Sequence, residues 1–303
     1  MAKSDTISQT PDTRNRVCYL NLSPSDELQG LCVTTAGFQR VDACCSYPIK
    51  KHHRNDYYFN PDKGRILNEY QLIYVTGGGG FFESDSCPRR KVRPGTVITL
   101  FPDEWHTYSP DRNGWEERWV GIKGDIIDRW VEGGILSKEK PVNEIGIIPD
   151  VISLYERLLR IASEEGIGHQ QLLAGIALNL IGEVNYRSKN LQFGQTDAMK
   201  KIVRARNIMK NSIENPVAPA AIAEKLCVSY SWFRRTFKAY TGLSPALYQQ
   251  NLRHLRAKEL LTTTDMSISE IAYTLNFEGL SQFSIAFAKK EGISPTRFRK
   301  HCR

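Results

Sequence analysis

Two short segments near the C-terminus carry polar and basic side chains at spacings that suit contact with nucleic acid. Each segment, residues 230–240 and residues 280–291, holds two phenylalanines four positions apart, which predict one buried helical stripe. The outward positions are Ser231, Arg234, Arg235 and Lys238 in the first segment and Ser281, Gln282, Ser284 and Lys289 in the second. A helix that presents such side chains can enter the DNA major groove and reach base edges.

These segments belong to an internal duplication with a period of about fifty residues. Both copies show Ile-Ala-x-x-Leu, then Phe-x-x-x-Phe, then Gly-x-Ser-Pro, and they begin at Ile222 and Ile271. Each copy predicts a short helix (residues 220–226 and 269–276), a tight turn and a second helix, which is a helix-turn-helix. The alternative is two ordinary helix pairs in an all-helical domain. The duplication and the polar outward faces favour the helix-turn-helix.

Charge is unevenly distributed along the chain. Residues 198–303 hold 18 Lys+Arg and 7 Asp+Glu, a net charge of +11, which leaves −3 for residues 1–197 of the total of +8. A positive charge confined to one domain suits contact with the phosphates of double-stranded DNA.

Cysteine and histidine spacing gives no sign of a metal site or an enzyme. The seven cysteines include no Cys-x-x-Cys pair, so reduced thiols in a cytoplasmic protein are expected. His106 stands alone, whereas a metal-binding cupin needs His-x-His, a Glu and a further His. No signal peptide or membrane-length apolar run is present. We therefore expect no metal, no cofactor, no catalytic residues and no membrane partner.

The N-terminal half has β patterning after a polar arm at residues 1–16. Residues 17–148 predict a sandwich or barrel, because short runs rich in β-branched and aromatic residues alternate with Gly/Pro turns. Predicted strands cover residues 70–76, 81–84, 96–101 and 115–122. The four glycines at residues 77–80 predict a turn between the first two strands.

Helical periodicity replaces the β pattern after residue 148. Residues 149–188 predict an antiparallel helical pair, which either covers the barrel or forms a dimer seam, and we favour a homodimer. Residues 189–197 predict a polar linker, and residues 198–303 form the basic domain. Within it, residues 245–261 predict a helical spacer of roughly 26 Å, at 1.5 Å per residue, between the two helix-turn-helix units. Its basic residues are candidates for phosphate contacts or for a solvated face: Arg253, Arg256 and Lys258.

Residues 198–303 resemble the DNA-binding domain of AraC/XylS-type transcription regulators. The residues that carry the resemblance are Ile271-Ala272, Phe277, Gln282-Phe283-Ser284, Phe287, Lys289, Gly292-Ile293-Ser294-Pro295 and Phe298-Arg299. The N-terminal half resembles the cupin-like sensor of the arabinose-responsive branch, in residues 70–80, 93–96, 100–102 and 115–120. The resemblance implies an α+β two-domain protein with an N-terminal cupin-like β-barrel and helical hairpin, followed by an all-α double helix-turn-helix.

In that family the outward positions of the two recognition helices contact bases. The resemblance therefore assigns DNA contacts to the outward residues given above and adds Leu280 and Ile285. Arg234 or Arg235 could bind guanine with two hydrogen bonds, and Gln282 could bind adenine. Because Ile285 stands where members often carry Arg, the second helix is expected to contact thymine methyls or to add shape and backbone contacts. Leu280 could instead pack against Phe277.

The resemblance also implies a sugar pocket. Trp119 matches the stacking tryptophan of the arabinose-responsive branch, Tyr108 matches a pocket tyrosine, and Glu117 stands where that branch has histidine. An ionised Glu117 would accept hydrogen bonds but donate none, which would change hydroxyl recognition. Arg65 and Arg54 are both candidates for the expected pocket arginine. Strand alternation places Glu117 and Trp119 on one face, where the aromatic residues could also be ordinary core.

We therefore expect a ligand-responsive regulator that activates sugar-utilisation genes. Its effector would be a pentose or a related sugar, and RNA polymerase is a candidate partner. One alternative is a ligand-independent DNA-binding regulator whose barrel only dimerises. A cupin isomerase or epimerase is the other, but it lacks the metal ligands and leaves the basic C-terminal domain unexplained.

Overall fold

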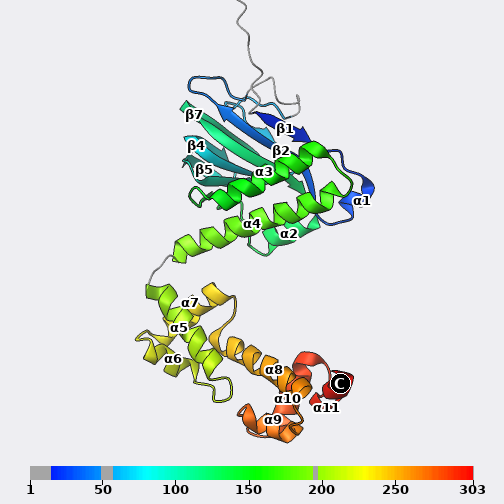
Figure 1. Ribbon diagram of the computed structural model, residues 1–303. Helices are drawn as coiled ribbons and strands as arrows, with labels where there is room; N and C mark the ends of the chain where they lie inside the picture. Colours follow the sequence, from blue (N-terminus) through cyan, green and yellow to red (C-terminus); the bar gives the residue numbers. More distant parts are fainter. Residues whose placement is uncertain (1–14, 49–56, 194–196, 303) are drawn as a thin grey trace, which may run out of the picture. The chain divides into compact units, whose positions relative to one another are not determined.

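The computed structural model describes residues 15–48, 57–193 and 197–302 of the chain, which folds as two compact units, Met1–Gln192 and Phe193–Arg303 (Figure 1). The expected arm at residues 1–16 lies almost wholly outside the described residues, and so does Arg54.

The first unit is built on one antiparallel sheet with the order β1-β2-β7-β4-β6-β8, in which β3 pairs with β7 and β5 with β4. Its strands are β1 (Arg16–Tyr19), β2 (Cys32–Val41), β3 (Arg65–Ile66), β4 (Tyr70–Ser84), β5 (Cys87–Val92), β6 (Thr96–Leu100), β7 (Trp105–Lys123) and β8 (Val142–Glu144). β4 and β7 pair along most of their length and form the spine of the sheet. This confirms the expected cupin-like antiparallel β domain.

Alternation along the two long strands divides the buried residues between two faces. Leu72 and Tyr74 of β4 pack with Val120 of β7 in one apolar cluster, whereas Ile73 packs with Trp119 in another. Side chains of adjacent strand residues point to opposite faces, so each strand supplies both clusters. The second cluster is the one that lines the pocket described below.

The four glycines at residues 77–80 do not form a turn, and this prediction was wrong. They lie inside β4, which runs unbroken through them and pairs with β7 across two register shifts. Gly78 has φ of 68°, and a Cβ on Gly80 would lie 2.0 Å from the Ser109 carbonyl oxygen. Glycine is required here because a bulged strand approaches its neighbour too closely for a side chain.

The helices α2 (Asp125–Glu132), α3 (Pro149–Glu164) and α4 (His169–Phe193) cover one face of the sheet (Figure 1). The short helix α1 (Pro24–Glu27) has no buried residue. Tyr155 and Leu158 of α3, with Leu173 and Leu180 of α4, share the apolar cluster of Leu72. The first of the two predicted roles, covering the sheet, is therefore observed. α4 also continues through the first five residues of the predicted linker, since no helix breaker occurs before Gly194.

The second unit is all-helical. It contains α5 (Asp197–Asn211), α6 (Pro219–Lys225), α7 (Tyr230–Thr241), α8 (Pro245–Thr263), α9 (Ile268–Thr274), α10 (Leu280–Glu291) and α11 (Pro295–Cys302). Ser229, Ser244 and Ser267 cap the starts of α7, α8 and α9 with their hydroxyls. Such caps satisfy amide groups that the first helical turn leaves without partners. α7 and α10 end before glycines at left-handed φ, as the repeated Gly-x-Ser-Pro motif predicts.

Each helix-turn-helix has its own apolar core. Phe233 and Phe237 are buried against α5 and α6, and Phe283 and Phe287 are buried against α9 and the C-terminal half of α8. α8 contributes to both cores, with Leu252 in the first and Ala257 in the second. The duplicated phenylalanines therefore fix which face of α7 and of α10 points outward.

Candidate functional site

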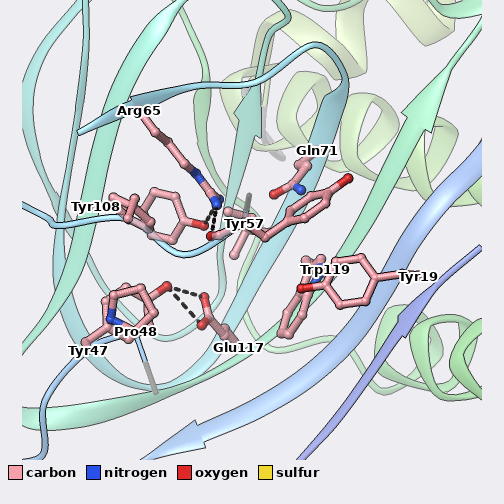
Figure 2. Close-up of a pocket in the computed structure, with 11 residues that line it drawn as sticks. Tyr19, Tyr47, Pro48, Tyr57, Arg65, Gln71, Tyr108, Glu117 and Trp119 are labelled. Atoms are coloured by element: carbon pink, nitrogen blue, oxygen red, sulfur yellow. Dashed lines mark hydrogen bonds between the residues drawn. The ribbon is translucent and has the colours of Figure 1, made fainter. Parts of the chain in front are cut away.

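A pocket on the sheet face opposite α3 and α4 collects all four of the predicted ligand-binding residues: Arg65, Tyr108, Glu117 and Trp119 (Figure 2). They come from β3 and β7, which are paired through Arg65 and His106. The other lining residues are Tyr19, Tyr47, Pro48, Tyr57, Phe59, Gln71 and Ile73. The wall is thus mostly aromatic with a few polar groups, which is the composition of a small-molecule site.

Arg65 is the positive group of the pocket. Its Nη2 donates to the Tyr108 hydroxyl at 2.7 Å, and its Nη1 donates to the Tyr57 carbonyl oxygen at 2.5 Å. The guanidinium also lies over the Phe59 ring, 4.5 Å from its centroid. Figure 2 shows the guanidinium pointing between Tyr57 and Tyr108. These neutral acceptors orient the guanidinium without neutralising it.

His106 is held as a neutral imidazole beneath Arg65. Its Nδ1 donates to the Glu104 carbonyl oxygen at 3.0 Å, and its Nε2 accepts from Arg65 Nε at 3.4 Å. Burial and the Arg65 charge lower the pKa of His106 to about 4. The histidine is therefore an acceptor that positions Arg65.

Glu117 has a different protonation state from the ionised one assumed from the sequence. It is 3% exposed, and the Tyr47 hydroxyl lies 3.1 Å from its Oε1. Burial raises the pKa of Glu117 to about 8, although the Tyr47 hydrogen bond and the Arg65 charge act to lower it. At neutral pH the carboxyl group therefore keeps its proton, and it can donate one hydrogen bond as well as accept.

Trp119 lies flat against β2 because Gly37 leaves room for it. A Cβ on Gly37 would lie 2.0 Å from Cζ2 of the indole. Gly37 and Trp119 are register partners in the β2–β7 pair, and Figure 2 shows the Trp119 ring beside that of Tyr19. This role of Gly37 has no local sequence signal, because the requirement arises from a cross-strand neighbour.

A buried carboxylate behind the pocket was also missed. Glu69 is 1% exposed and accepts hydrogen bonds from Thr34, Thr35, Tyr57 and Gln71. Tyr57 and Gln71 line the pocket, so this carboxylate fixes two of its polar side chains. Thr34 and Thr35 precede Glu69 by 35 and 34 residues, so the tertiary structure is needed to bring these two donors to the carboxylate.

The pocket is nearly closed. Its cavity measures about 20 Å³, which leaves room for about one water molecule. A sugar could enter only if lining side chains moved.

The predicted DNA-contacting residues of α7 are all on its solvent face. The exposed side chains are those of Ser231, Arg234, Arg235 and Lys238. Phe233 and Phe237, on the opposite face of the helix, are part of the core. The three basic side chains form no ion pair with any residue that the structure describes. They are therefore free to contact phosphates or bases.

The predicted residues of α10 differ more in their surroundings. Leu280 is 43% exposed and Ile285 is 70% exposed, so neither is a core residue. Ser281 and Lys289 are exposed and Ser284 is half-buried. Gln282 is exposed, but its Oε1 accepts from the Glu278 amide at 3.0 Å and its Nε2 donates to the Glu278 carboxylate at 3.2 Å. To bind adenine, Gln282 would have to give up these contacts.

Two of the three basic residues of α8 hold this helix to its neighbours. Arg253 donates to the Leu275 carbonyl oxygen, at 2.7 Å from Nη2, and to that of Asn276 at 3.0 Å. Lys258 pairs with Glu291 of α10 at 3.0 Å. Arg256 lies near the surface, where it pairs with Glu259 of α8 itself at 2.9 Å and with Glu214 at 3.4 Å. The contacts of Arg253 and Lys258 match neither of the two sequence-based interpretations.

Two absences complete the description. Among residues 15–48, 57–193 and 197–302, no three His, Cys, Asp or Glu side chains gather as a metal site would require. Within the same ranges, no helix has the length and apolar character needed to cross a membrane.

Comparison with known proteins gives matches in both units. A family model described as an AraC-like ligand binding domain matches residues 46–181, and one described as a helix-turn-helix domain matches residues 222–301. An uncharacterised HTH-type transcriptional regulator of Escherichia coli K12 is 24% identical over 272 residues, covering 89% of this chain and 88% of that protein.

Two further relatives have names that mention sugars. The arabinose operon regulatory protein of Salmonella typhimurium is 25% identical over 268 residues, covering 84% of this chain and 91% of the relative. The raffinose operon transcriptional regulatory protein of Pediococcus pentosaceus is 24% identical over 247 residues, covering 78% and 86%.

Proposed function

Because this chain belongs to the AraC family of transcription regulators, which are not enzymes, we propose that it controls sugar-utilisation genes in response to a sugar bound in the pocket of the first unit. The observation that carries the proposal is that Arg65, Tyr108, Glu117 and Trp119 line one pocket. Trp119 would stack on the C–H face of a pentose or related sugar. The polar groups would bind its hydroxyls. The relatives named for arabinose and raffinose operons support a sugar as the effector.

In the second unit, α7 and α10 would each enter a major groove of the same duplex. The exposed basic side chains of both helices support this arrangement, and α8 would separate the two helices. At 19 residues α8 spans roughly 28 Å at 1.5 Å per residue, close to one turn of DNA at roughly 34 Å. The protein would act as an activator, with RNA polymerase as a partner.

We also propose that the regulator is a cytoplasmic homodimer. All seven cysteines are free, which suits a reducing compartment. α4 leaves Leu172, Tyr186 and Leu191 exposed while its opposite face covers the sheet. These apolar side chains would lie in the dimer contact.

Selection of DNA from a random pool tests the proposal, with and without a mixture of pentoses and their oligosaccharides. We expect a bipartite motif whose half-elements lie about one turn apart, and a change in affinity or spacing when sugar is present. A specific motif that no sugar affects would contradict the sugar effector. No enriched motif would contradict sequence-specific DNA binding.

One observation favours a second candidate, a ligand-independent regulator whose sheet domain only dimerises. The pocket cavity of about 20 Å³ is too small for a sugar unless side chains move. Calorimetry separates the two, since this alternative predicts no heat of binding with any sugar.

A further inference from the structure

We infer that the effector carries a carboxylate which pairs with Arg65, so that the pocket takes a sugar acid in preference to a neutral sugar. This inference rests on the proposed role of the pocket as the effector site. A uronic acid fits it well, since it keeps a pentose-like ring and adds one carboxylate at C5.

Arg65 carries an unbalanced charge in the pocket. Its acceptors among the described residues are a carbonyl oxygen, the Tyr108 hydroxyl and the imidazole of His106, all of them neutral. No carboxylate of the residues that the structure describes lies within ion-pair distance of it. A bound ligand would remove the remaining water from this guanidinium, which is costly unless the ligand itself supplies a negative charge.

Neither nearby glutamate can supply that negative charge. Glu117 is directed at the Tyr47 hydroxyl and is buried with its proton. Glu69 lies behind the wall, where four donors already use its oxygens. His106, the other titratable group against Arg65, is neutral. The tyrosine hydroxyls of Tyr47 and Tyr108 stay protonated because their pKa values are raised.

Arg65 also has N–H groups left for a ligand. A guanidinium has five N–H groups, and three of those on Arg65 are used, one on each nitrogen. One N–H therefore remains on Nη1 and one on Nη2, which together can hold a carboxylate. Across the pocket, the protonated Glu117 can donate a further hydrogen bond to the same anion or to a ring hydroxyl.

The test compares sugars that differ only in this group. Calorimetry with the full-length protein would measure D-galacturonate against D-galactose and D-glucuronate against D-glucose, with methyl galacturonate as the uncharged control of similar size. We expect one acid to bind about 10- to 100-fold tighter than its neutral counterparts, the gain of a hydrogen bond to a charged group.

Arg65 variants connect the preference to the residue. In Arg65→Gln the preference for the acid should disappear. Arg65→Lys keeps the positive charge but loses the paired N–H donors of the guanidinium, so part of the preference should remain. Circular dichroism would verify that each variant is folded. If a variant is unfolded, the comparison of acid and neutral sugar in the natural protein decides alone.

The outcomes separate this inference from the proposed function. Neutral sugars that bind as tightly as the acids would overturn the carboxylate inference and leave the sugar sensor in place. If neither acids nor neutral sugars bind, both fail. Acid binding that persists in Arg65→Gln would also overturn the inference, because the carboxylate would then be held elsewhere.

The pH dependence gives an independent readout. The affinity for galacturonate should fall as pH rises through about 8, because Glu117 then ionises and repels the ligand. Galactose should show a smaller change. Glu117→Gln, which cannot ionise, should flatten the galacturonate curve. A galacturonate affinity that is independent of pH in the natural protein would contradict the arrangement.

Discussion

Glu117 shows how burial can dominate a nearby opposite charge. The carboxyl group has a tyrosine donor at 3.1 Å and an arginine across the pocket, yet the pKa rises to about 8. Desolvation disfavours the charged form, and at 3% exposure little water remains to offset it. The pocket therefore presents a carboxylic acid and a guanidinium at neutral pH, which is a positive site.

This protonation predicts a specific pH dependence of stability. The folded state holds a proton that the unfolded state releases near pH 4.5, so the Glu117 contribution to the free energy of unfolding falls as pH rises from there to about 8. The slope is at most about 1.4 kcal/mol per pH unit. The His106 contribution has the opposite sign, because it falls as pH drops through 6.5 towards about 4. Comparing the natural protein with Glu117→Gln removes this contribution, since both proteins keep His106.

Urea unfolding at pH 6.5 to 8, followed by tryptophan fluorescence, would measure how the free energy of unfolding depends on pH. Four of the five tryptophans (Trp105, Trp115, Trp119 and Trp130) lie in the first unit, so the signal reports mainly on that unit. Glu117→Gln should lose stability less steeply than the natural protein across this window. Parallel curves for the two proteins would show that Glu117 is ionised at neutral pH.

The close approach of the Trp119 indole to Gly37 predicts that a side chain at residue 37 destabilises the protein. In Gly37→Ala the new Cβ would overlap the Trp119 indole, so either the ring or β2 must shift, at a cost of about 1–3 kcal/mol. Gly77→Ala is the matched strand control, because its Cβ would meet only the Glu116 Cβ, at 3.5 Å. Near-UV circular dichroism and urea unfolding would compare them. Equal small effects in both variants would mean that the indole is not confined by Gly37.

At the scale of elements, Arg253 joins the spacer helix to the second helix-turn-helix. It binds the carbonyl oxygens at the end of α9 and lies 4.0 Å from the centroid of the Phe277 ring. Arg253→Met should destabilise α9 and α10 by about 1–3 kcal/mol, because the part-buried Leu275 carbonyl oxygen and the exposed one of Asn276 lose a charged donor. Hydrogen exchange of residues 268–291 would measure this as faster local opening.

Arg256→Met is the matched control for Arg253→Met. Arg256 pairs with Glu214 and Glu259 near the surface, where ion pairs contribute about 0–1 kcal/mol. Its loss should therefore change exchange in residues 268–291 little. Equal acceleration in the two variants would assign the effect to lost charge on α8 and not to the cap on α9.

The elements differ in how far the sequence determines them. The duplicated phenylalanines and the glycines that follow them predict α7 and α10 to within a residue, and Ser229 adds a cap to the start of α7, because the signals that start, bury and end a helix are local. Strand alternation likewise places Glu117 and Trp119 on one face. The glycines at 77–80 could not be interpreted in this way, since the need for glycine at Gly78 and Gly80 comes from the close approach of the β7 backbone. The contacts of Glu69 with Thr34 and of Arg253 with Leu275 could not be predicted either, because these partners are distant in the sequence.

At the scale of the whole molecule, net charge and its position have separate consequences. The second unit carries the positive charge of the chain, but several of its basic residues are paired internally, among them Arg256 and Lys258. Lys238 on α7 is exposed and unpaired among the described residues. Net charge sets the general attraction to DNA, whereas only cations that reach phosphates displace condensed counterions.

The salt dependence of DNA binding distinguishes these two effects. Lys238→Gln and Arg256→Gln each remove one positive charge from the full-length protein, so attraction by net charge alone predicts equal changes. If Lys238 contacts a phosphate, its loss should reduce the slope of log affinity against log salt by about one, with a similar loss of affinity on all sequences. Arg256→Gln should leave the slope nearly unchanged. Titration of labelled DNA from about 50 to 200 mM salt measures both slopes. Equal slopes in the two variants would show that α7 does not place Lys238 against the DNA backbone, and would contradict its assignment as a recognition helix in that orientation.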